Sequence, residues 1–251
     1  MNYLFRIYQW LIAAPIFIAI TFVTALITIV MTSLGNRDFW GYWPAHIWSR
    51  IVCALAFVRV KVHGKGNISP DTSYVFVANH QGAFDIWAIF GYLGHNFKWL
   101  MKKSLEDIAF VGYACRKSGH VFVDDSKISA IRDTIANAEH TLKDGMSVVI
   151  FPEGSRSWDG SMTEFKRGAF MLAGEFGLPV VPVTIDGAFK AMPRTTYNVT
   201  PCTIHLTIHP PVMPGERGFN TKVLMKQCKD AISSALPATA IVNDTQAATQ
   251  A

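Results

Sequence analysis

The sequence is poor in charged residues. Only 16% of its 251 residues are Asp, Glu, Lys or Arg, whereas 50% are hydrophobic. Soluble domains usually carry about 25% charged residues, so this deficit predicts contact with lipid. The length suits one globular domain with at most an appendage.

The sequence also lacks clustered cysteines and dense basic blocks. Its four cysteines are scattered and form neither a CxxC pair nor a Cys/His cluster, which argues against a zinc site and against a disulfide framework: Cys53, Cys115, Cys202 and Cys228. Such thiols are typical of small apolar packing residues in a reducing compartment. Aromatic residues do not alternate with basic ones, so nucleic acid is not an expected partner. The net charge of +5 predicts attraction to anionic lipid or phosphorylated small molecules.

Charge is absent altogether from residues 7–36. This run exceeds the roughly 20 apolar residues that cross a bilayer, and it is too long for the apolar core of a signal peptide. Pro15 is expected to kink the helix. Aromatic residues flank the run as interface anchors do: Tyr8, Trp10, Phe39, Trp40, Tyr42 and Trp43.

A second segment, residues 45–58, is amphipathic, with Arg50 on its polar side, and is predicted to lie in the headgroup layer. We expect residues 1–60 to form a membrane-anchoring helical hairpin in one leaflet, or one span followed by an interfacial helix. A helix buried in a soluble core is the remaining alternative. Basic residues flank both ends of the run and weakly favour a location of the rest of the chain on the cytoplasmic face of the membrane.

Residues 61–236 have the pattern of an α/β domain. Several strand candidates are continuous apolar runs, as in sheets covered on both faces: 58–62, 74–78, 97–101, Val121–Val123, 147–151, 180–185 and 202–208. Helical patterns lie between them, including a stripe capped by Asp125 or Ser126: Ile128, Ile131, Ile135, Ala138 and Leu142. This alternation predicts a mixed, largely parallel sheet flanked by helices. The tail, residues 237–251, is predicted to be disordered.

The stretch "NHQGAFD" places His80 just after an apolar strand and Asp85 in the first turn of a predicted helix. Five positions on a regular helix would put the two side chains on different faces. They meet if His80 lies in the turn, where Asp85 can fix its tautomer and make it a general base for a hydroxyl. A structural histidine that caps the helix is the alternative.

The stretch "VVIFPEGSRSWDG" runs from a buried strand into a loop. Pro152 stops the strand, and Glu153 and Arg156 follow at the carboxyl end, where α/β sheets place ligands. Gly154 and Ser155 let backbone N–H groups approach an anion, and Arg156 can grip a phosphate with two hydrogen bonds. The alternative is a tight turn with a surface ion pair.

Two basic pairs could join this phosphate site. Lys102 and Lys103 follow a strand, and Lys166 and Arg167 precede a helix. Each pair alone is more typical of a solvated face. Together with Arg156 they could surround a phosphate.

The two stretches together resemble the glycerolipid acyltransferases. "NHQGAFD" matches the NHx4D motif and "FPEGSRS" the FPEG(T/S)RS motif of the 1-acyl-sn-glycerol-3-phosphate acyltransferase family. "GHVFVDD" and "LPVVPVTI" also follow in the family's order. The resemblance covers about residues 60–210, and the spacing of the two motifs makes it specific.

The resemblance implies transfer of an acyl group from acyl-CoA or an acyl-carrier protein to a hydroxyl of a lysophospholipid at the bilayer. It implies that His80 is the general base and Asp85 orients it, with no metal, cofactor or covalent intermediate. Residues expected at the substrate are Asn79, Lys102, Lys103, Lys127, Glu153, Gly154, Ser155, Arg156, Lys166 and Arg167. Glu153 is expected on the glycerol, Arg156 on the phosphate, and residues 181–185 near the acyl donor. Backbone N–H groups near "NH" are candidate oxyanion donors.

The chain departs from the family at two positions. Asp125 stands where the family usually has an arginine for the acceptor phosphate, and Lys127 is the expected substitute. Ala109 stands where a proline is common. Two alternatives therefore remain: an acyltransferase for another lysophospholipid or a lyso-aminolipid, and a catalytically silent lipid-binding protein.

Overall fold

The computed structural model describes residues 3–123, 146–214 and 220–238. Its centre is one seven-stranded sheet in the order β1-β7-β6-β2-β5-β3-β4. The predicted helical stripe of residues 128–142, Asp125, Lys127 and most of the predicted tail lie outside the described residues.

Each of the seven strand candidates forms a strand, with bounds shifted by one or two residues at most. The strands are β1 Arg59–His63, β2 Val75–Ala78, β3 Phe97–Lys102, β4 Val121–Val123, β5 Ser147–Ile150, β6 Val180–Asp186 and β7 Thr203–Ile208. β6 and β7 pair antiparallel, and the other neighbours pair parallel. The prediction of a mixed, largely parallel sheet is confirmed.

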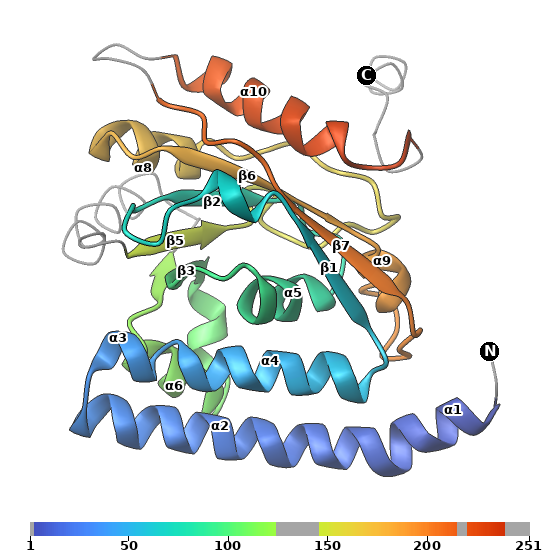
Figure 1. Ribbon diagram of the computed structural model, residues 1–251. Coiled ribbons are helices and arrows are strands. Elements are labelled where there is room, and N and C mark those ends of the chain that lie inside the picture. The colour runs from blue at the N-terminus through green and yellow to red at the C-terminus, as the bar shows by residue number, and fades with distance from the viewer. Residues whose placement is uncertain (1–2, 124–145, 215–219, 239–251) are drawn as a thin grey trace.

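Because successive side chains of a strand point to opposite faces of the sheet, the strands contribute to two separate hydrophobic cores. Val75 and Val77 of β2 point to one face of the sheet, and Phe76 and Ala78 to the other. Helices α8 (Gly168–Phe176) and α10 (Thr221–Ser234) cover the first face. Helix α5 (Phe84–Tyr92) covers the second, with α4 (Trp43–Leu55) beyond it (Figure 1).

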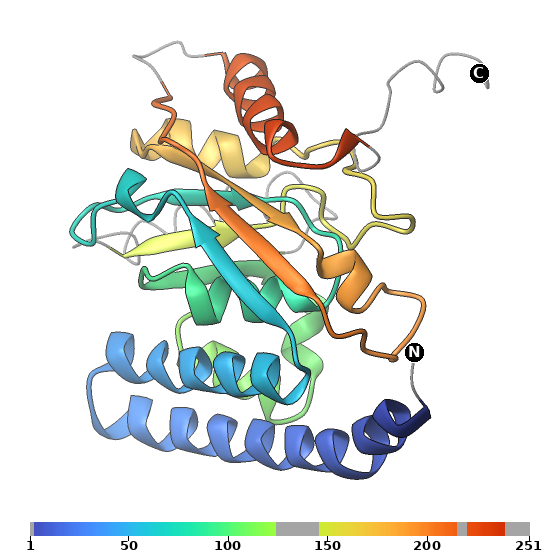
Figure 2. The same ribbon diagram turned by 45° about the vertical axis from the view of Figure 1, so that its right-hand side comes forward.

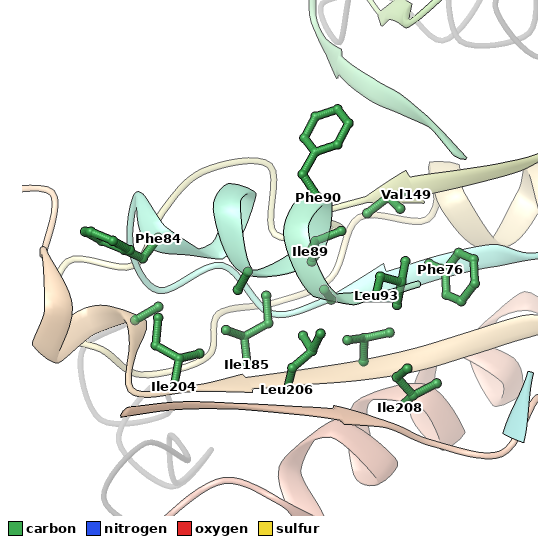
Figure 3. Packing of buried hydrophobic residues seen from close by; sticks show 14 of the residues in the cluster. Phe76, Phe84, Ile89, Phe90, Leu93, Val149, Ile185, Ile204, Leu206 and Ile208 are labelled. Carbon is green, nitrogen blue, oxygen red and sulfur yellow. The ribbon is translucent and has the colours of Figure 1, made fainter. Parts of the chain in front are cut away.

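The core under α5 is built from large side chains that are almost completely buried. Figure 3 shows side chains of α5, and of Leu93 directly after it, facing those of the sheet: Phe84, Ile89 and Leu93 opposite Phe76, Ile185, Ile204, Leu206 and Ile208. A mostly apolar α5 therefore packs its whole length against the sheet. This packing fixes the turn before α5, which carries His80.

The amino-terminal run forms a long helix that continues through α1 (Tyr3–Tyr8), a π-helical turn (Gln9–Ala13) and α2 (Ala14–Leu34). Pro15 lies one residue after the π turn. Because proline clashes with the carbonyl four residues earlier, a wider turn there accommodates the ring. Tyr3–Leu34 is the one described helix long and apolar enough to cross a membrane, and 11% of its most apolar window is buried.

The long helix lies alongside the α/β domain. The short helix α3 (Arg37–Trp40) reverses the chain, so α4 runs back between α2 and α5 (Figures 1 and 2). Arg50 of α4 donates from Nε to the carbonyl of Gly91 at 2.8 Å and lies over the ring of Tyr92. The side chain of Arg50 thereby attaches α4 to α5 while remaining exposed, and the placement of residues 45–58 in the headgroup layer stays a prediction.

Four short elements complete the described chain. They are η2 (Lys65–Asn67), η3 (Lys103–Asp107), α6 (Val111–Lys117) and α9 (Ala188–Ala191). α6 contacts α2, and α9 follows β6 at the edge where β2 and β5 also end. That edge carries the candidate site.

Candidate active site

The turn between β2 and α5 brings the predicted histidine and aspartate together. His80 lies in the turn, and Asp85 lies in the first turn of α5. Nδ1 of His80 is 2.8 Å from Oδ2 of Asp85. Since a carboxylate only accepts hydrogen bonds, Nδ1 carries the proton, and Nε2 keeps its lone pair.

The fully buried carboxylate of Asp85 organises the whole turn. Its Oδ2 atom accepts from Nδ1 of His80 and from the backbone N–H groups of Gln81 (2.7 Å) and Gly82 (2.8 Å). The N–H of His80 is also used, by Glu153. These three N–H groups near the "NH" motif therefore point at protein carboxylates, which contradicts their predicted role as oxyanion donors.

An aromatic ring packs against one face of the imidazole of His80. The ring of Phe151 lies 3.9 Å from that of His80 at an angle of 7°, and Trp99 stacks on Phe151 in turn. The His80 side chain is 13% exposed. Within the described part of the chain, no hydrogen bond engages its Nε2, which is the atom available to a substrate.

Glu153 ties the second motif to the first. It is 6% exposed, and burial raises the pKa of its carboxyl against the opposing effect of hydrogen bonds from Thr163 and His80. Its Oε1 accepts from the N–H of His80 at 2.7 Å, while its Oε2 accepts from the N–H and the hydroxyl of Thr163. Its predicted contact with glycerol stays a prediction, and this geometry favours a positioning role.

The side chain of Asn79 is likewise engaged in hydrogen bonds within the protein. Its side chain is fully buried, with Nδ2 donating to the carbonyl of Ile185 and Oδ1 accepting from the N–H of the same residue, both at 2.8 Å. The end of β2 is thereby fixed to the end of β6. This geometry disfavours the predicted contact of Asn79 with substrate.

Further hydrogen bonds join the two motif loops. The N–H of Ser157 donates to the carbonyl of His80 at 2.8 Å, and Nε2 of Gln81 donates to the carbonyl of Gly160 at 2.9 Å. Both backbone polar groups of His80 are therefore held by the loop that follows β5. Residues of the two motifs form one rigid unit.

Gly154 adopts a conformation that favours glycine, with φ of +74°. A Cβ atom there would also lie 3.0 Å from Nζ of Lys166, so the ammonium group rests against the glycine backbone. The N–H of Lys166 donates to the carbonyl of Pro152 at 2.8 Å. The structure therefore brings Lys166 to the "FPEGSRS" loop, as predicted.

The remaining predicted residues lie around the same edge of the sheet. Arg156 is half-buried and precedes Ser157, while Ser155 is exposed. Lys102 is the last residue of β3, which pairs with β5, and Lys103 follows it; both side chains are exposed. Exposed Arg167 precedes α8.

Several residues of the site carried no strong sequence signal. Arg194 donates to the carbonyl of Arg156 at 2.9 Å and lies 3.7 Å over the ring of Trp158. It belongs to a loop far along the chain, so no local spacing relates it to the motifs. Ser157 was part of the quoted motif, yet its use of the backbone N–H could not be inferred from its side chain.

Both motifs lie within a recognised family region. The model of the Acyltransferase family matches residues 59–186, which run from β1 through β6. The chain belongs to this family.

The chain is similar to several proteins of that family. It is 29% identical to a chloroplastic 1-acyl-sn-glycerol-3-phosphate acyltransferase of Arabidopsis thaliana, over 88% of this chain and 63% of the relative. It is 30% identical to 1-acyl-sn-glycerol-3-phosphate acyltransferase alpha of Homo sapiens, over 62% of this chain and 55% of the relative. The chain thus spans roughly two thirds or less of these two relatives.

A solved structure matches over nearly the whole chain. The crystal structure of the 1-acyl-sn-glycerophosphate acyltransferase of Thermotoga maritima superposes with a TM-score of 0.74 and 27% identity. The match covers 93% of both chains. The similarity therefore includes the amino-terminal helices as well as the α/β domain.

Proposed function

We propose that this protein transfers an acyl group from a thioester to the sn-2 hydroxyl of 1-acylglycerol-3-phosphate, giving phosphatidic acid. The observation that carries the proposal is the Asp85–His80 pair at the carboxyl edge of the sheet, in which Nε2 makes no hydrogen bond to any of the described residues. Family membership and the names of the relatives support the reaction class.

The chemistry follows from the orientation of His80. Nε2 removes the proton of the acceptor hydroxyl as its oxygen attacks the thioester carbonyl carbon. The C–S bond then breaks, the thiolate leaves, and the imidazolium returns the proton to sulfur. Asp85 stabilises the imidazolium through Nδ1–H, so the products are an ester and a free thiol with no covalent enzyme intermediate.

The acceptor phosphate is assigned to the cationic residues around the "FPEGSRS" loop. Arg156 and Lys166 are the leading candidates, since Lys166 lies against Gly154 and Arg156 is held beside Ser157. Lys102, Lys103 and Arg167 are proposed as further contributors, and Lys127 is proposed as the substitute for the arginine that Asp125 replaces. The acyl donor is proposed to be acyl-CoA or acyl-carrier protein, as a co-substrate.

The long helix is proposed to embed in one leaflet with its axis along the membrane surface. Its contacts with α4 and α6 favour this arrangement, since a transverse span would carry α4 and part of the α/β domain into the bilayer with it. We propose an inner membrane of the bacterial type, with the α/β domain on its cytoplasmic face. Within this arrangement residues 1–60 act as the anchor and residues 61–236 as the catalytic domain.

The deciding experiment is acyl transfer by purified protein, with products identified by mass spectrometry. His80→Ala should lower kcat by about 10²–10⁴-fold. His63→Ala, an exposed histidine on β1, is the matched control and should keep full activity. Activity of His80→Ala within tenfold of the wild type would reject the base assignment.

The acceptor is decided by mixed acceptors and mixed thioesters in one reaction. Preferred acylation of 1-acylglycerol-3-phosphate supports the proposal. Preference for a neutral lysophospholipid or a lyso-aminolipid, which Asp125 motivates, would replace the acceptor and keep the chemistry. A wild-type protein that binds lipid and acylates none of the acceptors would indicate the silent lipid-binding alternative.

A further inference from the structure

An apolar patch on the α/β domain lies next to the amino-terminal helix. Five of its side chains, on η3, on α6 and on the turn between them, are exposed by 36% to 58%: Leu105, Ile108, Phe110, Val111 and Tyr113. We name this set the 105–113 patch. Single exposed apolar residues are ordinary on protein surfaces, but a group of this density marks an interaction surface.

Short-range contacts hold the patch in its outward conformation. A Cβ atom on Gly112 would lie 2.1 Å from the carbonyl oxygen of Glu106, so only glycine allows the chain to close this tightly. Glu106 also pairs with Arg116 at 2.8 Å. Phe110 has φ of +60°, a strained value for a residue with a side chain. A tight turn with a defined backbone conformation therefore holds the side chain of Phe110 in its exposed position.

The patch is continuous with the apolar surface of the long helix. The ring of Phe110 meets that of Phe22 of α2 at 5.3 Å in an edge-to-face contact, and both rings remain about half exposed. Figures 1 and 2 both show α6 and the loop before it descending past α4 to the level of α2. No other part of the described α/β domain extends as far in that direction in these views.

Cationic residues flank the patch in the sequence. Lys102 and Lys103 precede it, and Arg116 and Lys117 follow it. The last two also lie over the ring of Tyr113, at 6.0 Å and 5.7 Å. An apolar centre, a tyrosine and flanking cations fit the boundary between acyl chains and anionic headgroups.

We propose that the 105–113 patch is a second bilayer contact, inserted into the same leaflet as the long helix. A single rod lying in a membrane leaves the attached domain free to roll about the rod's axis. A contact beside the rod stops this rolling and sets the height of the catalytic edge above the lipid. The inference rests on the proposed membrane position of the helix and is independent of the acyl-transfer chemistry.

Spin-label accessibility in liposomes tests the proposal. Nitroxides are attached to Ile108→Cys and to Phe110→Cys, in full-length protein with Cys115→Ala and Cys202→Ala. The other two cysteines, Cys53 and Cys228, are fully buried and escape labelling. The backbone of Ile108 is unstrained, so it keeps the test valid if Phe110→Cys fails to fold.

Two further labelled positions serve as matched controls. Ile18→Cys lies on the long helix, 67% exposed, and Val223→Cys lies on α10 on the opposite side of the sheet, 51% exposed. Liposomes of phosphatidylglycerol and phosphatidylethanolamine are used, with oxygen and a water-soluble nickel chelate as relaxing agents. Oxygen accumulates in lipid and the chelate in water, so their ratio reports depth.

The proposal predicts an oxygen-to-nickel ratio at positions 108 and 110 several-fold above that at 223, and comparable with that at 18. A ratio at 108 and 110 equal to that at 223, with position 18 in lipid, overturns this inference alone. A water-like ratio at position 18 overturns the membrane position of the helix as well. Low access to both agents with dipolar broadening between labels would indicate a second copy of the chain and overturn the lipid assignment.

Discussion

The ring of His80 lies flat on the ring of Phe151, with centroids 3.9 Å apart and planes 7° apart. The hydrogen bond from Nδ1 to Asp85 fixes one edge of the imidazole, and the stack fixes its plane. The orientation of Nε2 is thus fixed by two contacts: the hydrogen bond, which lies along the edge of the ring, and the stack, which lies against its face. The face of a phenyl ring also attracts a positive charge, so Phe151 would favour the imidazolium that the proposed proton transfer produces.

Replacing Phe151 should therefore slow the chemistry. Phe151→Leu is expected to lower kcat by about three- to thirtyfold, the value of a ring–cation contact, with little change in KM. Phe151→Tyr keeps the aromatic face and should retain most of the activity. The measurement is steady-state acyl transfer with saturating donor; equal losses in the two variants would count against the stacking role.

Replacing Glu153 should distinguish positioning from substrate contact. A glutamine offers one acceptor oxygen, so in Glu153→Gln either the N–H of His80 or that of Thr163 loses its partner. We expect kcat to fall by about tenfold or more, with KM for the acceptor nearly unchanged.

The matched control for Glu153 is Thr163→Val. This variant removes only the hydroxyl that donates to Oε2 and keeps the backbone N–H bond. Its kcat should fall less than that of Glu153→Gln. A rise in acceptor KM at constant kcat for Glu153→Gln would instead support direct binding of the glycerol.

The ion pair between Lys98 and Asp38 joins strand β3 to the short helix α3, which lies between α2 and α4. Lys98 on β3 is 2% exposed, and its Nζ lies 2.9 Å from Oδ1 of Asp38. Burial lowers the pKa of Lys98, and Asp38 opposes this shift. Asp38→Asn leaves the buried ammonium without its counter-charge, and we expect a loss of about 1–3 kcal/mol in the free energy of unfolding.

The contrast with Lys98→Met makes this prediction specific. Methionine removes the buried charge together with the need for a partner, so its Tm should lie closer to that of the wild type than the Tm of Asp38→Asn does. Thermal unfolding of the two variants in the same detergent is the measurement. A larger drop for Lys98→Met would show that the pair is net stabilising.

Stability should also depend on pH through His120. Burial lowers the pKa of His120 from 6.5 to about 3, and the charges of Lys98 and Arg37 add to this effect. Nδ1 of His120 accepts from the N–H of Trp99 at 3.2 Å, a contact that needs the neutral ring. As the pH falls, His120 therefore binds a proton near pH 6.5 in the unfolded chain, whereas in the folded chain it stays neutral at that pH.

The lowered pKa of His120 sets the direction in which the free energy of unfolding changes with pH. The stability contributed by neutral His120 is fully present above pH 6.5 and is lost progressively as the pH falls towards 3. At pH 5 the loss is about 2 kcal/mol. His120→Asn, which keeps an acceptor near the position of Nδ1, should show a flatter fall in Tm between pH 7 and pH 5. Parallel curves for the two proteins would contradict the prediction.

The sequence predicted the strands well because their signal is local. The run at 74–78 is continuously apolar and that at 180–185 contains one polar residue, Thr184, as is typical of strands buried on both faces, and they form β2 and β6. The pairing of His80 with Asp85 was likewise predictable, since both lie in one turn. The attachment of α4 to α5 could not be predicted, because the hydrogen bond from Arg50 to Gly91 depends on tertiary packing.

The scaffolding of the site could not be predicted, because it depends on strand order. Glu153 reaches the N–H of His80 only because β5 lies beside β2. Nothing in the linear spacing between the two motifs indicates this neighbour. The π turn before Pro15 was anticipated only as a kink.

The double hydrogen bond between Asn79 and Ile185 joins residues 106 positions apart. Closing so long a loop is slow compared with forming a helix, since the chain loses entropy before the contact rewards it. β2 can pair with its two neighbours, β5 and β6, only after these later parts of the chain have been synthesised. During synthesis, the amino-terminal helix is therefore complete and able to reach lipid well before the histidine turn acquires its final shape.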